Sequence, residues 1–352
     1  MPIETDAILE VLAELVAARG PCGHEDEVDA VCRRHLEPFC DEVTTDPAGN
    51  VVGLIRGQSR EPGVKVMAHK DELGAYVKRI EDDGRLSVRP RGFLYRRFGD
   101  GPVDVLPDSG EPIPGVIGLG PRHASENPGE PRDGKEVSWE AVRVNTRLSR
   151  DELRVRGVHA GSRVVVGRSR RRLFFFEDCV GSYFLDDRAG IALMLAAGAE
   201  VRRGGPPPCD VHFICSSLEE IAGGAAAYAS HSLPGEILLA LDVAPAAPEY
   251  DVPLDAMPVI LVSDQQSVYS RAVCRALAEA GEAAGTGSRY AAVEHYGSDA
   301  SCVRKTGGAA QIGCLGLPTD NTHGFEVCVR EGLTNCAKLL AAYLQTGGSG
   351  SA

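Results

Sequence analysis

A histidine and an acid stand two residues apart where a predicted strand ends. The stretch Val64-Lys65-Val66-Met67 alternates β-branched and apolar residues, which is typical of a strand, and His69 and Asp71 follow it closely. One imidazole nitrogen can bind a metal ion while a carboxylate accepts a hydrogen bond from the other nitrogen. Taken alone, such a pair is more typical of ordinary polar packing, so its interpretation depends on the rest of the chain.

Two pairs of acids stand at junctions between predicted elements. Asp186 and Asp187 stand at the start of a predicted helix, where Asp is also a favoured capping residue. Glu219 and Glu220 follow an apolar strand that ends at Cys215. Two adjacent glutamates at a strand end cannot share one role, so one is a candidate metal ligand and the other a candidate base. The alternative for both pairs is a set of acids that only stabilises a helix start.

Two single residues complete the set. Asp242 closes the apolar run from Ile237 to Leu241, and ligands bind outside the carboxyl ends of parallel strands. His323 lies in a polar loop and, alone, is typical of an exposed histidine. Together the five segments offer the ligands for two divalent ions bridged by one carboxylate, with one glutamate left over. These residues are His69, Asp186, Glu219, Glu220, Asp242 and His323.

The elements that must position these residues alternate between strands and helices. The alternation predicts an α/β fold, a mostly parallel sheet with helices on both faces. Helical spacing of apolar residues predicts helices over 5–18, 25–36, 188–203, 223–230, 267–281 and 331–344. Strands are predicted at 43–45, 51–55, 64–69, 211–215, 237–241 and 258–262.

The pattern changes between residues 73 and 166. A hairpin is predicted from Tyr76 to Val88, further strands at 114–118 and 161–166, and a mobile loop at 123–136. Dense Pro and Gly with almost no helical periodicity indicate a small β-barrel-like insertion. The predicted domains are therefore a discontinuous catalytic domain (1–72 and 167–346), the insertion (73–166) and a flexible tail (347–352).

Composition excludes several classes of function. The 352 residues have a formal net charge of -13, which argues against a nucleic-acid partner, and the Arg-rich stretch 168–172 is predicted to be a solvated turn. No apolar stretch is long enough to span a membrane, and the N-terminus lacks the pattern of a secretory signal, so we expect a cytoplasmic protein. The 11 cysteines include no CxxC pair and indicate buried or incidental thiols.

The order of these motifs resembles the glutamyl-aminopeptidase/TET family of dinuclear metallo-aminopeptidases, which have a phosphorylase/zinc-peptidase-like fold. The resemblance covers most of residues 6–345. It rests on His-x-Asp-Glu at 69–72, Asp-Asp-Arg-x-Gly at 186–190, Glu-Glu-x-x-Gly at 219–223, Asp242 and His323. Further similar stretches are Cys-Gly-His-Glu at 22–25, the Gly-Asn-Val turn at 49–51, residues 114–123 and Gly-Ser-Asp-Ala at 297–300.

The resemblance implies a role for each site residue. His69 and Asp242 would bind one ion, Glu220 and His323 the other, and Asp186 would bridge the two. The ions would be zinc, cobalt or manganese, because imidazole and carboxylate sites accept all three.

Further implications concern the reaction and the partners. Glu219 would be the general base, Asp71 would orient His69, and the Asp186–Asp187 peptide bond would be cis. The substrates would be short peptides with a free α-amine. The insertion would mediate dimerisation in a homo-oligomer. The resemblance implies that the dimers could build an assembly as large as a dodecamer.

The chain departs from the family's pattern in three places. Asp320 and Asn321 stand where relatives usually have Arg-Tyr, which removes a cation and an aromatic ring beside the metals. Lys70 replaces a neutral residue, and residues 142–146 replace an acidic, Gly-containing stretch of the insertion. Two alternatives therefore stay open: another amidohydrolase on the same scaffold, such as a deacylase or carboxypeptidase, or a metal-stabilised oligomeric scaffold without peptidase activity.

Overall fold

The chain forms two compact units. The computed structural model describes residues 3–108, 110–121, 137–221 and 223–348. The larger unit comprises Met1–Asp71 and Leu173–Ala352, and the smaller unit comprises Glu72–Arg172, where the sequence placed the insertion at 73–166. The loop predicted at 123–136 lies outside the described residues, as does most of the tail predicted at 347–352.

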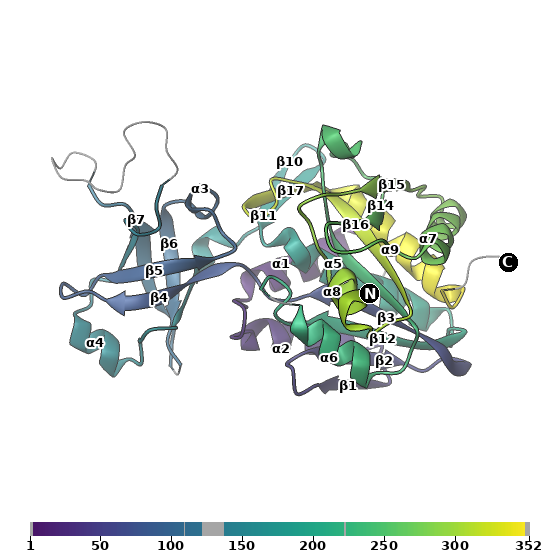
Figure 1. Ribbon diagram of the computed structural model, residues 1–352, viewed down its shortest axis with the longest axis horizontal. Helices are drawn as coiled ribbons and strands as arrows, with labels where there is room; N and C mark the ends of the chain where they lie inside the picture. The colour runs from purple at the N-terminus through teal and green to yellow at the C-terminus, as the bar shows by residue number, and fades with distance from the viewer. Residues whose placement is uncertain (1–2, 109, 122–136, 222, 349–352) are drawn as a thin grey trace. The chain divides into compact units, whose positions relative to one another are not determined.

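The larger unit is built on one sheet, in which eleven strands lie within the described residues (Figure 1). Its strand order is β1-β2-β12-β3-β13-β16-β17-β11-β10, with β14 beside β16 and β15 beside β14. The strands are β1 (Glu42–Thr45), β2 (Val51–Ile55), β3 (Ser59–His69), β10 (Phe174–Phe176), β11 (Cys179–Tyr183), β12 (Cys209–Ser216), β13 (Ile237–Pro245), β14 (Val259–Ser263), β15 (Arg289–Ala292), β16 (Gln311–Asp320) and β17 (Phe325–Val329).

The centre of this sheet is parallel, and the pairings outside it are antiparallel except for that of β14 with β15. Strands β12, β3, β13 and β16 run parallel, and their apolar residues are buried on both faces, as expected for a covered parallel sheet. Ser216 pairs in register with His69, so β12 and β3 end at the same edge. The prediction of an α/β fold with an inserted barrel is confirmed. The sheet, predicted as mostly parallel, is mixed, and its parallel centre ends at the site.

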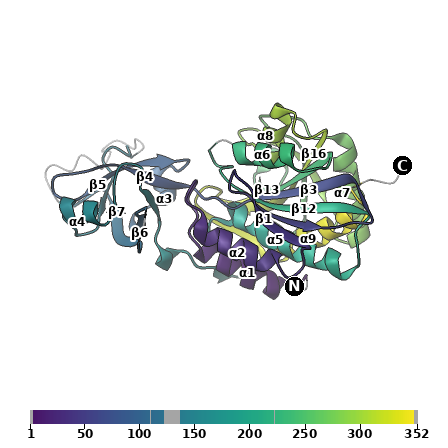
Figure 2. The ribbon, with the colours of Figure 1, turned by 90° about the horizontal axis from the view of Figure 1, so that it is seen from below.

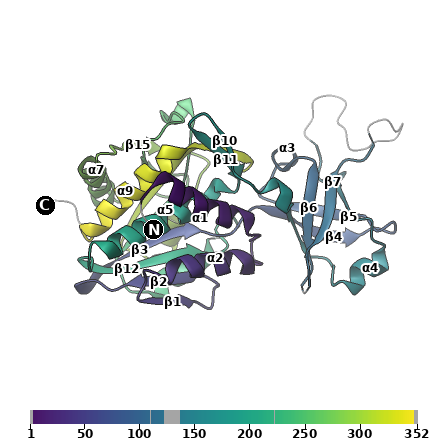
Figure 3. The same cartoon turned by 180° about the vertical axis from the view of Figure 1, so that it is seen from behind.

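Helices cover both faces of the sheet. Figure 2 shows α6 and α8 on one face and α1, α2, α5 and α9 on the other, and Figure 3 shows α1, α5 and α9 side by side. No helix within the described ranges is long and apolar enough to cross a membrane. The helices are α1 (Thr5–Ala17), α2 (Asp26–Leu36), α5 (Leu185–Arg203), α6 (Gly224–Ser232), α7 (Arg271–Ala284), α8 (Asp299–Thr306) and α9 (Arg330–Gln345), with a 3-10 turn η2 at Pro248–Tyr250.

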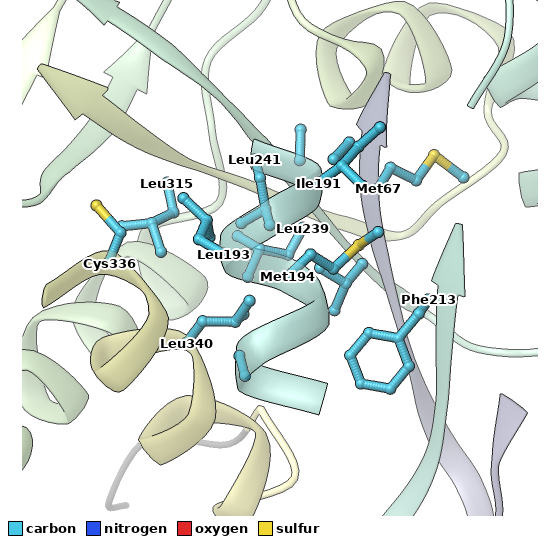
Figure 4. Packing of buried hydrophobic residues seen from close by; sticks show 14 of the residues in the cluster. Met67, Ile191, Leu193, Met194, Phe213, Leu239, Leu241, Leu315, Cys336 and Leu340 are labelled. Carbon is cyan, nitrogen blue, oxygen red and sulfur yellow. The ribbon is translucent and has the colours of Figure 1, made fainter. Parts of the chain in front are cut away.

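Helix α5 is the central helix of the core. Its side chains Ile191, Leu193 and Met194 pack between the sheet and α9 (Figure 4). A small residue of α5 allows the close approach to the sheet: a Cβ on Gly198 would lie 3.1 Å from the Phe213 ring on β12. Because α5 is buried almost throughout, its N-terminal residues Asp186 and Asp187 are held firmly at the edge where the parallel strands end.

The smaller unit is a closed barrel with the strand order β4-β5-β8-β7-β6-β9. Its interior is apolar; Val88, Val144 and Val164 are fully buried. Arg171 is also buried and forms an ion pair with Glu72, so the prediction of a solvated turn at 168–172 is wrong for this residue. The elements are β4 (Gly74–Ile80), β5 (Leu86–Arg91), α3 (Tyr95–Phe98), β6 (Gly101–Leu106), β7 (Ile113–Gly118), β8 (Arg143–Asn145), α4 (Arg150–Val155), β9 (Arg163–Val166) and the 3-10 turn η1 (Arg168–Arg170).

Candidate metal centre

The carboxylate of Asp186 lies between two imidazole rings. Its Oδ1 is 3.0 Å from Nε2 of His69, and its Oδ2 is 3.5 Å from Nε2 of His323. Asp186 has a non-helical backbone at the entry to α5, and the Asp186–Asp187 peptide bond is cis, as the resemblance implied. A carboxylate that offers one oxygen to each of two imidazoles has the arrangement needed to bridge two cations.

The two adjacent glutamates face different imidazoles. Oε2 of Glu219 lies 4.0 Å from Nε2 of His69, and Oε2 of Glu220 lies 3.6 Å from Nε2 of His323. The preceding residue, Leu218, has a positive φ of 61°, so the chain turns sharply between the end of β12 and this pair. The geometry therefore gives the two carboxylates separate positions, as two separate roles require.

Three side chains offer ligand atoms close enough to hold one ion. Within the described residues, a nitrogen of His69 and one carboxylate oxygen each of Asp186 and Glu220 lie within 4.8 Å of one another. Asp242 lies on β13 and is buried, and its Oδ1 accepts a hydrogen bond from the Val243 N–H at 2.7 Å. Asp242 is not part of this group of three; burial, then the charges of Asp186 and Asp187, raise its pKa.

The Asp71 carboxylate lies near His69, but its hydrogen bonds go elsewhere. Its Oδ1 is 3.7 Å from Nδ1 of His69, while the backbone oxygen of Asp71 is closer to that nitrogen, at 3.2 Å. The carboxylate accepts hydrogen bonds from the N–H groups of Glu219 at 3.0 Å and Glu220 at 3.2 Å, and from the Cys22 thiol at 3.1 Å. One buried acid thus fixes the backbone of both glutamates beside the histidine.

Further side chains hold the loop that bears these glutamates. The Ser217 N–H donates to Oδ1 of Asn50 at 3.0 Å, and the Ser217 hydroxyl donates to Oε2 of Glu25 at 2.5 Å. The Ser216 hydroxyl donates to Asp299 at the start of α8. The segments at 22–25, 49–51 and 297–300, which supported the resemblance, therefore surround this one loop.

Lys70, one of the departures from the family's pattern, is buried with its charge compensated. Its ammonium pairs with Glu25 and with Oδ1 of Asp29, the latter at 2.7 Å. Burial favours the neutral amine, but the two carboxylates more than offset it, so the pKa of Lys70 lies above its ordinary value. The positive charge of Lys70 is thus compensated by Glu25 and Asp29 and does not face the candidate metal ligands.

The site gathers several buried acidic side chains, which raise one another's pKa values. Burial first, and neighbouring carboxylates after it, raise the pKa values of Glu219 and Glu220. Burial alone would lower the pKa of His69, but its hydrogen bond to Asp186 and the charge of Glu219 raise it well above the ordinary value. Imidazole nitrogens and carboxylate oxygens suit divalent cations, and cations would compensate this charge, so the residues present fit a metal centre.

Two functional candidates were missed by the sequence analysis. Glu326 accepts the N–H of Asp186 at 2.9 Å and the N–H of His323 at 2.8 Å, and Asp187 accepts the N–H of His69 at 3.2 Å. Asp187 lies in the Asp-Asp-Arg-x-Gly motif at 186–190, but the sequence suggested no separate role for its side chain. The sequence around Glu326 did not mark this residue as functional, because a single acid in a short strand is common.

The family model for M42 glutamyl aminopeptidases matches residues 49–339. The chain belongs to the M42 glutamyl aminopeptidase family. It is accordingly a hydrolase acting on peptide bonds. Among curated relatives, YhfE of Bacillus subtilis (strain 168) is 27% identical over 352 residues, covering 96% of this chain and 97% of the relative. The lysyl aminopeptidase of Pyrococcus furiosus is 29% identical over 238 residues, covering 66% of each chain.

Solved structures of family members share the fold. The aminopeptidase APDkam598 from Desulfurococcus kamchatkensis matches with a TM-score of 0.87 at 24% identity, covering 97% of this chain and 95% of its own. The TET1 peptidase of Pyrococcus horikoshii, which can assemble into a tetrahedron or a large octahedral shell, matches with a TM-score of 0.84 at 23% identity, covering 96% and 99%. At these identities, the likeness of the structures supports the architecture alone.

Proposed function

We propose that this protein removes N-terminal residues from short peptides with the help of two divalent cations. The observation that supports it most strongly is the position of the Asp186 carboxylate between the His69 and His323 imidazoles. His69 and Asp242 would hold one ion, Glu220 and His323 the other, and Asp186 would bridge them. The separation of Glu219 from Glu220 leaves Glu219 free for proton transfer.

When bound, the divalent cations act as Lewis acids that polarise the scissile carbonyl and lower the pKa of water. The Glu219 carboxylate takes the proton from the attacking water at Oε2 and returns it to the nitrogen of the leaving amine. Because burial and neighbouring carboxylates raise the pKa of Glu219, the residue can hold that proton between the two steps. The Asp71 carboxylate keeps the Glu219 backbone in place throughout.

The proposed centre favours a free α-amine on the substrate. Such an amine would lie beside a bound cation or a carboxylate of the site, whereas acetylation removes both the charge and the lone pair that these contacts use. We also propose that the chain assembles into a homo-oligomer through the smaller unit, residues 72–172. The solved relatives whose titles name a dodecamer or a tetrahedron support an oligomer.

The test is the initial rate on a panel of aminoacyl anilides, each also prepared in N-acetylated form, with the protein loaded with zinc, cobalt or manganese. We expect cleavage of free but not acetylated substrates, and its loss on chelation. Glu219→Gln should lower kcat by about 10²–10⁴-fold while both ions stay bound. Cleavage of acetylated substrates alone would point to a deacylase instead. Full activity of the metal-loaded Glu219→Gln variant would exclude the mechanism.

A further inference from the structure

Glu326 is the buried acid that contacts the backbone of two predicted metal ligands. It lies on β17 and is only 1% exposed. Its Oε2 accepts the N–H of Asp186 at 2.9 Å, and its Oε1 accepts the N–H of His323 at 2.8 Å. The backbone amide of Leu185 also faces this carboxylate. One side chain therefore joins the start of α5 to the loop before β17.

The bonding of Glu326 differs from that of the ligands themselves. Both of its oxygens already accept backbone N–H groups, which ties the side chain to the backbone of both segments. Nε2 of His323 instead faces the carboxylates of Asp186 and Glu220. Glu326 thus lies behind the two ligands and determines where their backbones stand.

His323 needs such support more than the other ligands do. Its side chain is 48% exposed, and its φ of 59° is a left-handed conformation that a residue with a Cβ rarely adopts. Asn321, with a φ of 58°, closes the same loop through its Nδ2, which donates to the Phe325 carbonyl at 2.7 Å. A half-exposed loop with two left-handed residues depends on specific contacts to hold one geometry.

We infer that Glu326 is a positioning residue that sets the distance between Asp186 and His323 and thereby the affinity of the site for the second ion. This inference rests on the proposed function, because it takes the two residues to be metal ligands. Residues that orient metal ligands typically change metal affinity or activity about 10–100-fold when mutated.

The test compares Glu326→Gln with Asp210→Asn in zinc titrations of the metal-free chain, followed by calorimetry. Glutamine keeps the volume but turns one N–H acceptor into a donor, which would face a backbone N–H. Asp210 is a matched control, because it is a buried acid whose Oδ1 accepts the Gly57 N–H at 2.8 Å, at the opposite end of β12 from the site. Thermal unfolding of the metal-free variants reports whether each folds.

We expect wild type and Asp210→Asn to bind two zinc ions per chain. Glu326→Gln should bind the first ion normally and the second about 10–100-fold more weakly, with kcat/KM recovering as zinc is raised. If Glu326→Gln does not fold, Glu326→Asp, which keeps the charge but is shorter, should show the same selective loss of the second ion. Equal weakening in Asp210→Asn, or wild-type affinity for both ions in the Glu326 variant, would overturn the inference.

The outcomes separate this inference from the proposed function. A wild-type chain that binds two ions but cleaves no peptide contradicts the proposed function, and the Glu326 comparison still decides the inference by zinc affinity alone. Cleavage by wild type together with unchanged zinc binding in Glu326→Gln contradicts only the inference. A wild-type chain that binds no divalent ion contradicts both.

Discussion

The two histidines of the site stand in contrasting surroundings. The His69 side chain is 3% exposed and lies at the end of a central strand, whereas the His323 side chain is 48% exposed on a loop. His69 has its N–H bonded to Asp187 and its ring beside the Asp71 carbonyl oxygen. The N–H of His323 is bonded to Glu326, and its Nε2 lies near the carboxylates of Asp186 and Glu220.

This difference divides the site into a rigid half and an accessible half. The strands and α5 fix the candidate ligands around His69 through core packing, while His323 depends on a few hydrogen bonds, such as that of its N–H to Glu326. Elements that bind and release ligands are drawn from the less stable parts of a fold. We therefore expect the ion near His323 to exchange faster than the ion near His69, and substrate to enter from the His323 side.

We expect the largest effect on stability from Lys70→Met. Lys70 directly follows His69 and so belongs to the rigid half of the site. This change leaves Glu25 and Asp29 without their cation in a buried environment, so it should destabilise the protein by about 3–5 kcal/mol. The measurement is the free energy of unfolding in urea. The double variant Lys70→Met/Glu25→Gln should recover part of the loss. A single variant as stable as wild type would show that the buried charges are not coupled as the structure indicates.

The second prediction compares the histidines directly. His69→Ala removes a fully buried ring and should cost the metal-free protein about 2 kcal/mol or more, because a cavity remains and Asp186 loses a hydrogen-bond partner. His323→Ala should change stability by about 0.5 kcal/mol or less, since that ring is half exposed. Each variant should bind one ion fewer. Equal stability losses in urea unfolding would remove the proposed distinction between the two halves.

The third prediction concerns the pH dependence of stability near Asp299. Burial raises the pKa of this carboxyl to about 6, so the folded state binds its proton more tightly than the unfolded state does. The resulting stabilisation is complete below the ordinary Asp pKa and is lost as the pH rises through about 6. With chelator present, wild type minus Asp299→Asn should show stability that falls between about pH 4 and 6. A flat difference would contradict the raised pKa.

The sequence predicted the central strands β3, β12 and β13 and the candidate ligands because both follow local rules, but it did not predict the central strand β16. Apolar runs predicted β12 and β13, and the pattern after Asp187 predicted the regular part of α5. The acids and histidines at the strand ends then converge, because parallel strands of one sheet end at a common edge. The short strands β11 and β17 and the helix α8 were not predicted, since each depends on tertiary pairing more than on its own periodicity.

The supporting contacts could not be predicted from the sequence. Glu326 contacts Asp186 across 140 positions of the chain, and Asp71 contacts Glu219 across 148. Neither acid stands in a pattern that distinguishes a partner for backbone N–H groups from a ligand or a surface residue. The resemblance gave Asp71 the single task of orienting His69, whereas its carboxylate is bonded to the glutamate backbone.

The most direct test of the central claim is anomalous diffraction at the zinc edge from crystals of the zinc-loaded protein. We predict two peaks about 3.5–4 Å apart, one on each side of the Asp186 carboxylate, with the peak near His323 weakening first as zinc is withdrawn. A single peak, or two peaks of which neither contacts Asp186, would contradict the carboxylate-bridged centre on which the proposed function rests.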